Sequence, residues 1–275
     1  GDTHSYNTAV GYEAGRDNNG QENTYVGYFA GRLSTGGNEC TFVGSNAGYK
    51  NASSDNTALG RYALYNNIAA YNTGIGHQAG YGVTTGAFNT FVGERTGGSM
   101  GAGAGNVGVG RRSLYKATSS NNTCVGMQAG YGITSGNNNI AIGNGAMEVA
   151  LTTGDDNVVV GTSAGTNLTS GNKNVVIGNS AGYAITTSVH TVAIGHEALK
   201  ALVDGAHNVA VGAFALLRLT SGGVNVAMGL AAGSNITTGS HNTCLGYDSF
   251  QAVVGAGYNT GVGSSTGVYQ TGNYN

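Results

Sequence analysis

The chain has 275 residues, with 51 glycines, no proline, no tryptophan and only 9% charged residues. This composition excludes collagen, which needs proline in a Gly-X-Y period, and its 40% of apolar residues excludes an intrinsically disordered chain. A net charge of −2 provides no basic stripe for nucleic acid or anionic lipid, and no apolar run is long enough to cross a bilayer. We therefore expect no nucleic-acid partner and no membrane insertion.

One five-residue pattern, Asn-Thr/Val-x-aliphatic-Gly, recurs along nearly the whole chain. Its closing glycine, called the core glycine below, falls at sixteen positions that are 16 to 18 residues apart. These positions are 11, 27, 44, 60, 76, 93, 110, 126, 143, 161, 178, 195, 212, 229, 246 and 263. A unit of this length cannot bury a core alone, so neighbouring units must stack. The period predicts an all-β fold, a parallel β-solenoid (β-roll) of about 16 coils of roughly 17 residues.

The second and fourth positions of the pattern form two columns, which begin at Thr8 and Val10 and end at Thr260 and Val262. The second is always Thr, Val or Ile, and the fourth is always apolar. Residues two apart on a strand point to the same side, and β-branched residues favour strands. We expect one strand per unit, with both columns facing the core of the coil.

After the core glycine the chain is expected to turn and to form a second, shorter strand. An aliphatic residue recurs seven positions after the core glycine, and Thr-Thr-Gly or Thr-Ser-Gly then closes several coils. The aliphatic column comprises Val83, Ile133, Leu168, Ile185, Leu202, Leu219, Ile236 and Val253. Two strands and two turns per coil are therefore expected. The asparagine that opens each pattern, absent only at Cys40 and Thr191, is expected to close turns and to stack its amide from coil to coil.

The third position of the pattern is apolar or small in all sixteen units. If the second and fourth columns face the core, this one faces outward, and such a strip needs a cover. We therefore predict a parallel homotrimer whose interchain interface includes Ala9, Tyr25, Phe42, Phe91, Val159, Val176 and Ala210. Val176→Asp is then expected to break the assembly.

Six tyrosines share the position five residues after the core glycine, and Arg16 and Arg32 begin the same column. They are Tyr49, Tyr65, Tyr81, Tyr115, Tyr131 and Tyr183. Tyrosine rings stack on one another or on the faces of sugars. We expect a structural ladder at the surface, with a contact strip for glycans as the alternative.

Other reactive residue types form no catalytic or metal-binding pattern. Asp155 and Asp156 are the only adjacent carboxylates, and we expect them in a solvated turn rather than around a sugar. His190 and His207 share one position in consecutive units that elsewhere holds many polar residue types, so we expect a solvent-facing turn. Cys40, Cys124 and Cys244 are too many coils apart for a disulfide. We expect no enzyme, no cofactor and no metal.

The units at 139–143, 174–178 and 208–212 resemble the head repeats of trimeric autotransporter adhesins. The form Asn-Thr-Ala-Val-Gly-Tyr-x-Ala-Gly at residues 7–15 is similar to repeats of phage tail fibres. The resemblance covers almost the whole chain and implies a parallel homotrimer that attaches to a surface. The period departs from it, since adhesin heads commonly use a shorter unit.

We therefore expect one repeat array over residues 1–275, as a segment of a longer extracellular fibre protein on a cell surface or virion tail. It would act as a shaft or head that mediates attachment, with itself and a cell-surface or glycan receptor as partners. A self-assembling filament without a receptor, an ice-binding solenoid and a polysaccharide depolymerase are the alternatives. Ice binding is disfavoured by the expectation that the threonine column faces inward.

Overall fold

The computed structural model describes residues 5–149, 151–250 and 254–267. Over these residues the chain is an all-β parallel β-solenoid with one three-residue strand per coil and no helix, so the predicted fold class is confirmed. The chain divides into two compact units, Gly1–Ser135 (the first unit) and Gly136–Asn275 (the second unit).

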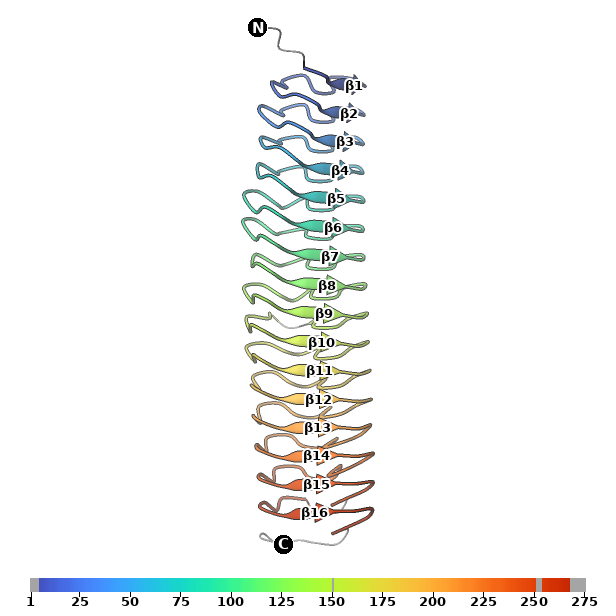
Figure 1. Cartoon of the computed structure of the whole chain (residues 1–275), viewed down its shortest axis with the longest axis vertical. Helices are drawn as coiled ribbons and strands as arrows, with labels where there is room; N and C mark the ends of the chain where they lie inside the picture. The colour runs from blue at the N-terminus through green and yellow to red at the C-terminus, as the bar shows by residue number, and fades with distance from the viewer. Residues whose placement is uncertain (1–4, 150, 251–253, 268–275) are drawn as a thin grey trace. The chain divides into compact units, whose positions relative to one another are not determined.

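Within each unit the strands lie above one another in sequence order (Figure 1). The first unit contains β1 (Thr8–Val10), β2 (Thr24–Val26), β3 (Thr41–Val43), β4 (Thr57–Leu59), β5 (Thr73–Ile75), β6 (Thr90–Val92), β7 (Val107–Val109) and β8 (Thr123–Val125). The second contains β9 (Ile140–Ile142), β10 (Val158–Val160), β11 (Val175–Ile177), β12 (Val192–Ile194), β13 (Val209–Val211), β14 (Val226–Met228), β15 (Thr243–Leu245) and β16 (Thr260–Val262). Equivalent residues pair in parallel register, as in Val175 with Val192 and Ile177 with Ile194.

The middle residue of each strand points into the coil. Tyr25, Phe42 and Phe91 are fully buried there, and so are the smaller residues at the same position in most other coils. Space for the large rings comes from glycine: a Cβ added to Gly31 would lie 2.4 Å from Tyr25 Cε1. Every coil therefore has a narrow interior that is filled by one strand residue and the side chains opposite it.

Strand residues and residues opposite them compensate for each other in volume. Gly108 is the middle residue of β7, and the buried side chain of Leu114, four residues after the core glycine of that coil, fills the space. Ala193 in β12 is matched in the same way by buried Leu199. Coils with a large strand residue carry glycine at that position, as Gly97 does beside Phe91. In β5 both positions are glycine, Gly74 and Gly80, and Leu64 of the preceding coil fills the space instead.

The predicted second strand does not form. The aliphatic column seven residues after the core glycine is fully buried, but it lies in turns, with an isolated parallel bridge between Val83 and Gly101. Its last member, Val253, lies outside the described residues. The backbone N–H of each of the other members donates to the carbonyl three residues earlier in the same coil, as Val83 does to Gly80 and Leu168 to Gly165, both at 3.1 Å. Because the N–H is used in this local turn, it does not pair with the neighbouring coil as a strand residue would.

Buried asparagines connect consecutive coils. Asn72 Oδ1 accepts hydrogen bonds from the backbone N–H and from Nδ2 of Asn89, at 2.9 and 3.0 Å. Asn89 Nδ2 also donates to the carbonyl of Gly103, 2.9 Å away in the turn that closes its coil. The same bonds recur in the second unit, where Asn157 Oδ1 accepts from Asn174. The expected asparagine stack, called the asparagine ladder below, is therefore confirmed, and it is buried from Asn23 to Asn259.

The two substitutions in the asparagine ladder keep part of its bonding, and Cys40 Sγ also lies 3.4 Å from the carbonyl of Ser53 in the turn that closes its coil. Cys40 and Thr191 each donate their backbone N–H to the preceding asparagine Oδ1, at 2.8 and 3.0 Å. Neither side chain has an amide carbonyl to offer to the next coil. The Thr191 hydroxyl instead donates to the carbonyl of Val189.

The core glycines permit the close stacking of the coils. Gly44 has φ of 133°, which side chains of L-residues rarely adopt, and a Cβ there would lie 2.7 Å from the carbonyl carbon of Gly60. Any side chain would push the coils apart. The backbone N–H of Gly60 also donates to the carbonyl of Val43 at 2.8 Å, so the turn belongs to the hydrogen-bonded stack.

The asparagine ladder makes a direct prediction for Asn174. Asn174→Ala leaves the N–H of Thr191 and the carbonyl of Ser188, now bonded at 3.0 and 2.8 Å, without partners in the interior. We expect the free energy of unfolding to fall by about 2 to 4 kcal/mol, because buried unpaired amide groups are costly. Urea unfolding followed by circular dichroism measures this.

The matched control is Asn179→Ala, since Asn179 lies in the next turn but is exposed. Its effect should stay within about 0.5 kcal/mol. Equal effects of the two substitutions would show that the ladder does not hold the coils together.

Candidate functional site

The first and third residues of each strand form the outer face of the sheet, called the strand face below. Leu59, Ile177 and Met228 are 47%, 36% and 47% exposed, and their columns are exposed or partly exposed throughout the described strands. These columns contain only Thr, Val, Ile, Leu and Met. Each unit therefore presents a strand face free of charge. In the first unit seven of the eight first-column residues are threonine, whereas the face of the second unit is mostly aliphatic.

The predicted interchain interface is wrong, because the two sides of the strand were assigned the wrong way round. Six of its seven residues are fully buried inside the coil of a single chain and cannot contact another: Tyr25, Phe42, Phe91, Val159, Val176 and Ala210. The seventh, Ala9 in β1, is exposed. The physical reason is that the narrow interior takes one small or planar side chain per strand, while the two β-branched columns fit an open sheet face.

Tyrosine rings stack along the first unit as expected. The ring centroids of Tyr49 and Tyr65 are 4.9 Å apart, and those of Tyr65 and Tyr81 are 5.4 Å apart, with interplanar angles of 9° and 13°. Tyr115 and Tyr131 stack at 5.4 Å and 3°. These five tyrosines, called the tyrosine ladder below, are all partly exposed. Burial, together with the neighbouring phenols, raises the pKa of Tyr65.

Tyr183, in the second unit, does not continue such a ladder. Its side chain is exposed, and the equivalent positions in the adjacent coils hold Thr166 and Lys200. The structure thus brings five of the six predicted tyrosines into two stacks and leaves the sixth without an equivalent ring beside it.

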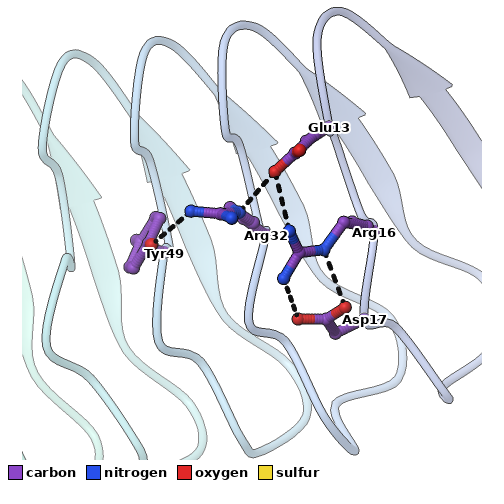
Figure 2. Close-up of polar contacts among 5 residues, drawn as sticks. All are labelled: Glu13, Arg16, Asp17, Arg32 and Tyr49. Atoms are coloured by element: carbon purple, nitrogen blue, oxygen red, sulfur yellow. Dashed lines mark hydrogen bonds and ion pairs between the residues drawn. The ribbon is translucent and has the colours of Figure 1, made fainter.

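Ionic contacts fill the beginning of the same column (Figure 2). Arg16 donates to both carboxylate oxygens of Asp17 at 2.9 Å and contacts Glu13 at 2.9 Å. Arg32 pairs with Glu13 and donates to the hydroxyl of Tyr49 at 3.0 Å. The bonds from Arg16 lower the pKa of Asp17. Two arginines and two carboxylates therefore neutralise each other at this end, which leaves little charge for a ligand.

A cavity of about 350 Å³ interrupts the tyrosine ladder. It is lined by Gln78, Tyr81, Arg95, Gly98 and Tyr115. Gly98 occupies the ladder position in the coil between Tyr81 and Tyr115, so a ring is missing there. We did not expect this site from the sequence, although the aligned column already contains the signal: one glycine among tyrosines.

The adjacent aspartates and the histidine pair lie in turns. Asp155 and Asp156 are exposed and accept hydrogen bonds from Asn137 and Asn138, as expected for a solvated turn. His190 and His207 are exposed and stack with ring centroids 5.2 Å apart. Over the described residues, no group of three or more His, Cys, Asp or Glu side chains could hold a metal ion.

The three cysteines are buried and unbridged. Burial raises the pKa of the Cys40 thiol and raises that of Cys244 to about 12. Both are therefore poor nucleophiles that serve as small packing residues. Nor does the described part of the chain contain a helix with the length and apolarity needed to span a membrane.

In comparisons with protein-family models, curated proteins and solved structures, nothing matches this chain. The assignment of the fold therefore rests on the strands and their parallel pairing in this chain.

Burial of Tyr25 predicts a pH dependence of stability. Its hydroxyl lies 3.1 Å from Asn18 Oδ1 and 3.2 Å from Ser34 Oγ, and burial raises its pKa to about 12 despite the bond with Ser34. The folded chain thus holds this proton more tightly than the unfolded chain, so stability is lost as pH rises from about 10 to about 12. The stability of wild type relative to Tyr25→Phe should fall over this range.

Urea unfolding of both proteins between pH about 9 and about 12 measures the effect. Tyr12→Phe, which removes an exposed phenol without changing the core, is the control. A constant difference between wild type and Tyr25→Phe would contradict the assignment of Tyr25 to the core.

Proposed function

We propose that this chain is a non-enzymatic structural and adhesive module of an extracellular fibre, which associates with copies of itself through the strand face and contacts glycans through the tyrosine ladder. The observation that carries the proposal is the absence of charge from the strand face in both units. The resemblance of the repeats to adhesin heads and tail fibres favours a parallel homotrimer.

The strand face has the chemistry of an interface. Soluble monomers rarely expose a large contiguous apolar patch, and the eight strands of the second unit, at about 4.8 Å spacing, give a mostly aliphatic one about 34 Å long. The strand face of the first unit has the same length and pairs a threonine column with an aliphatic column. Charged side chains occur elsewhere on the coils, for example at Glu94, Lys173 and Lys200, but never in the two strand columns. Depletion of charge is a mark of interface cores.

A second copy of the chain is the partner that fits this face best. The face repeats once per coil, so only a surface with the same period can match it along its length, and another copy has that period. Closed rotational symmetry would then cover every such face in a finite assembly.

Ile177→Asp tests this interface. Ile177 lies on the strand face of β11, so an added carboxylate should prevent association without entering the core. We expect wild type to have a mass of three chains by light scattering, and Ile177→Asp to have the mass of one chain with an unchanged circular dichroism spectrum.

Val203→Asp is the matched control, because Val203 is an equally exposed aliphatic residue outside the strands. It should leave the trimer intact. Val176→Asp is unsuitable, since that side chain is buried and the charge would unfold the coil. A monomeric wild type, or a trimeric Ile177→Asp, would refute the proposed interface.

Ice binding is the second candidate, and the orientation of the strands now favours it. The threonine column of the first unit, from Thr24 to Thr123 with a valine at Val107, faces outward rather than inward. A regular hydroxyl and methyl array on a flat sheet is a surface on which water can be ordered. Thermal hysteresis in an ice-growth assay, lost in Thr73→Tyr, would support this function over self-association.

A filament and a depolymerase would each give a distinct experimental signal. A self-assembling filament without a receptor would appear as continuous threads in electron micrographs instead of discrete particles. A depolymerase would release reducing ends from a polysaccharide.

A further inference from the structure

We propose that the gap in the tyrosine ladder is a binding slot for one acidic sugar residue, a pyranose that carries a carboxylate. This inference rests on the glycan-contact part of the proposed function and specifies the site and the charge of the ligand. The slot comprises Gln78, Tyr81, Arg95, Gly98 and Tyr115 and is called the ladder slot below.

The missing ring gives the slot its width. Neighbouring rings of the tyrosine ladder are 4.9 to 5.4 Å apart, close to the spacing of adjacent coils. Between Tyr81 and Tyr115 one coil carries Gly98 instead, so the two tyrosines are separated by two coil steps, or about 10 Å. The Tyr115 ring leans into part of this space, and the cavity occupies the rest. The volume of about 350 Å³ is within the range of small-ligand pockets.

Tyr115 already leans over the glycine. A Cβ on Gly98 would lie 2.6 and 2.7 Å from Tyr115 Cε2 and Cδ2. The ring therefore covers the position where a side chain would stand, and the face of Tyr81 bounds the other side. Aromatic faces of this kind stack on the apolar face of a pyranose.

Arg95 gives the slot its charge preference. Its Nε donates to Gln78 Oε1 at 2.9 Å and lies 3.9 Å from Glu94. Over residues 5–149, no hydrogen bond occupies the two terminal guanidinium nitrogens. Those nitrogens are the pair that binds a carboxylate in bidentate geometry. Arg32 differs, because Glu13 and Tyr49 already engage its guanidinium.

The surrounding coils are cationic although the chain as a whole is acidic. Between residues 77 and 131 the sequence has one carboxylate, that of Glu94, and four cationic side chains: Arg95, Arg111, Arg112 and Lys116. Glu94 lies 3.3 Å from Arg111, so its charge is already shared. The Nε of Arg112, one coil beyond Arg95, is buried without a hydrogen-bond partner. An anionic ligand would meet an unbalanced positive charge.

The test uses trigalacturonic acid and its methyl ester as probes, since they differ only in carboxylate charge. By titration calorimetry at low salt, we expect wild type to bind the acid at least tenfold more tightly than the ester, because a charge-assisted bidentate pair is lost. Arg95→Gln should bind both alike. Gly98→Tyr supplies the missing ring and should weaken binding of the acid at least tenfold.

Controls separate loss of the slot from loss of the fold. Gly98 has no positive φ, and the closest atoms that a Cβ would meet belong to the edge of the movable Tyr115 ring, so Gly98→Tyr should keep the wild-type melting curve. If that variant does not fold, Tyr81→Ala replaces it by removing one wall of the slot, with the same expected loss. Tyr131→Ala, outside the slot, should retain the preference for the acid.

Two outcomes would overturn the inference: equal affinity of wild type for acid and ester, or undiminished binding of the acid by folded Gly98→Tyr. Binding of both probes that is reduced by Tyr65→Ala but not by Gly98→Tyr would reject the slot while supporting the broader glycan strip. Trimer formation, measured separately, tests the rest of the proposed function.

Discussion

The stacking of the coils depends on the asparagine that precedes every strand except β3 and β12. Its Oδ1 accepts from the next coil and its Nδ2 donates to the turn that closes its own coil, so one side chain fixes both the spacing of coils and the end of each coil. Backbone bonds also join the coils, in the strands and in the turns, as from the Gly60 N–H to the Val43 carbonyl, and the asparagine adds a bond across its own coil. A short polar side chain with a donor and an acceptor is required, and among common residues asparagine meets that need at this reach.

Because the asparagine ladder lies beside the strands, the inner and outer sides of each strand can carry different types of residue. The interior is narrow and holds one strand side chain, whose size is balanced by the residue opposite, as Phe91 is by Gly97. The outer side carries β-branched residues that stack on their equivalents and need no fixed volume. Packing therefore limits which residues fit the middle column. The strand face is not limited in this way and can contact other copies of the chain or ice.

The period of the sequence was sufficient to predict the strands, the core glycines and the asparagine ladder, since each repeats at every coil. The period could not show which side of the strand faces the interior of the coil. Residues on both sides lack charge, so their alternation along the strand shows no clear difference in polarity. The discriminating signal was the pairing of Tyr25, Phe42 or Phe91 with a glycine six residues later. The second strand was predicted wrongly for another reason: the aliphatic column is buried, but its backbone N–H groups bond within their own coil, as Val83 does to Gly80.

The asparagine and tyrosine ladders are each interrupted at single positions, and these positions differ from the rest of the stack. Cys40 and Thr191 interrupt the asparagine ladder in the interior, where each keeps the backbone bond to the preceding asparagine but has no amide carbonyl for the next coil. Gly98 interrupts the tyrosine ladder outside, where the consequence is a cavity beside the guanidinium of Arg95. A side chain missing from the interior leaves hydrogen bonds unmade, whereas a ring missing from the surface leaves a cavity lined by Tyr81 and Tyr115. In a periodic protein, the surface exceptions are therefore the places where recognition of a single ligand residue can arise.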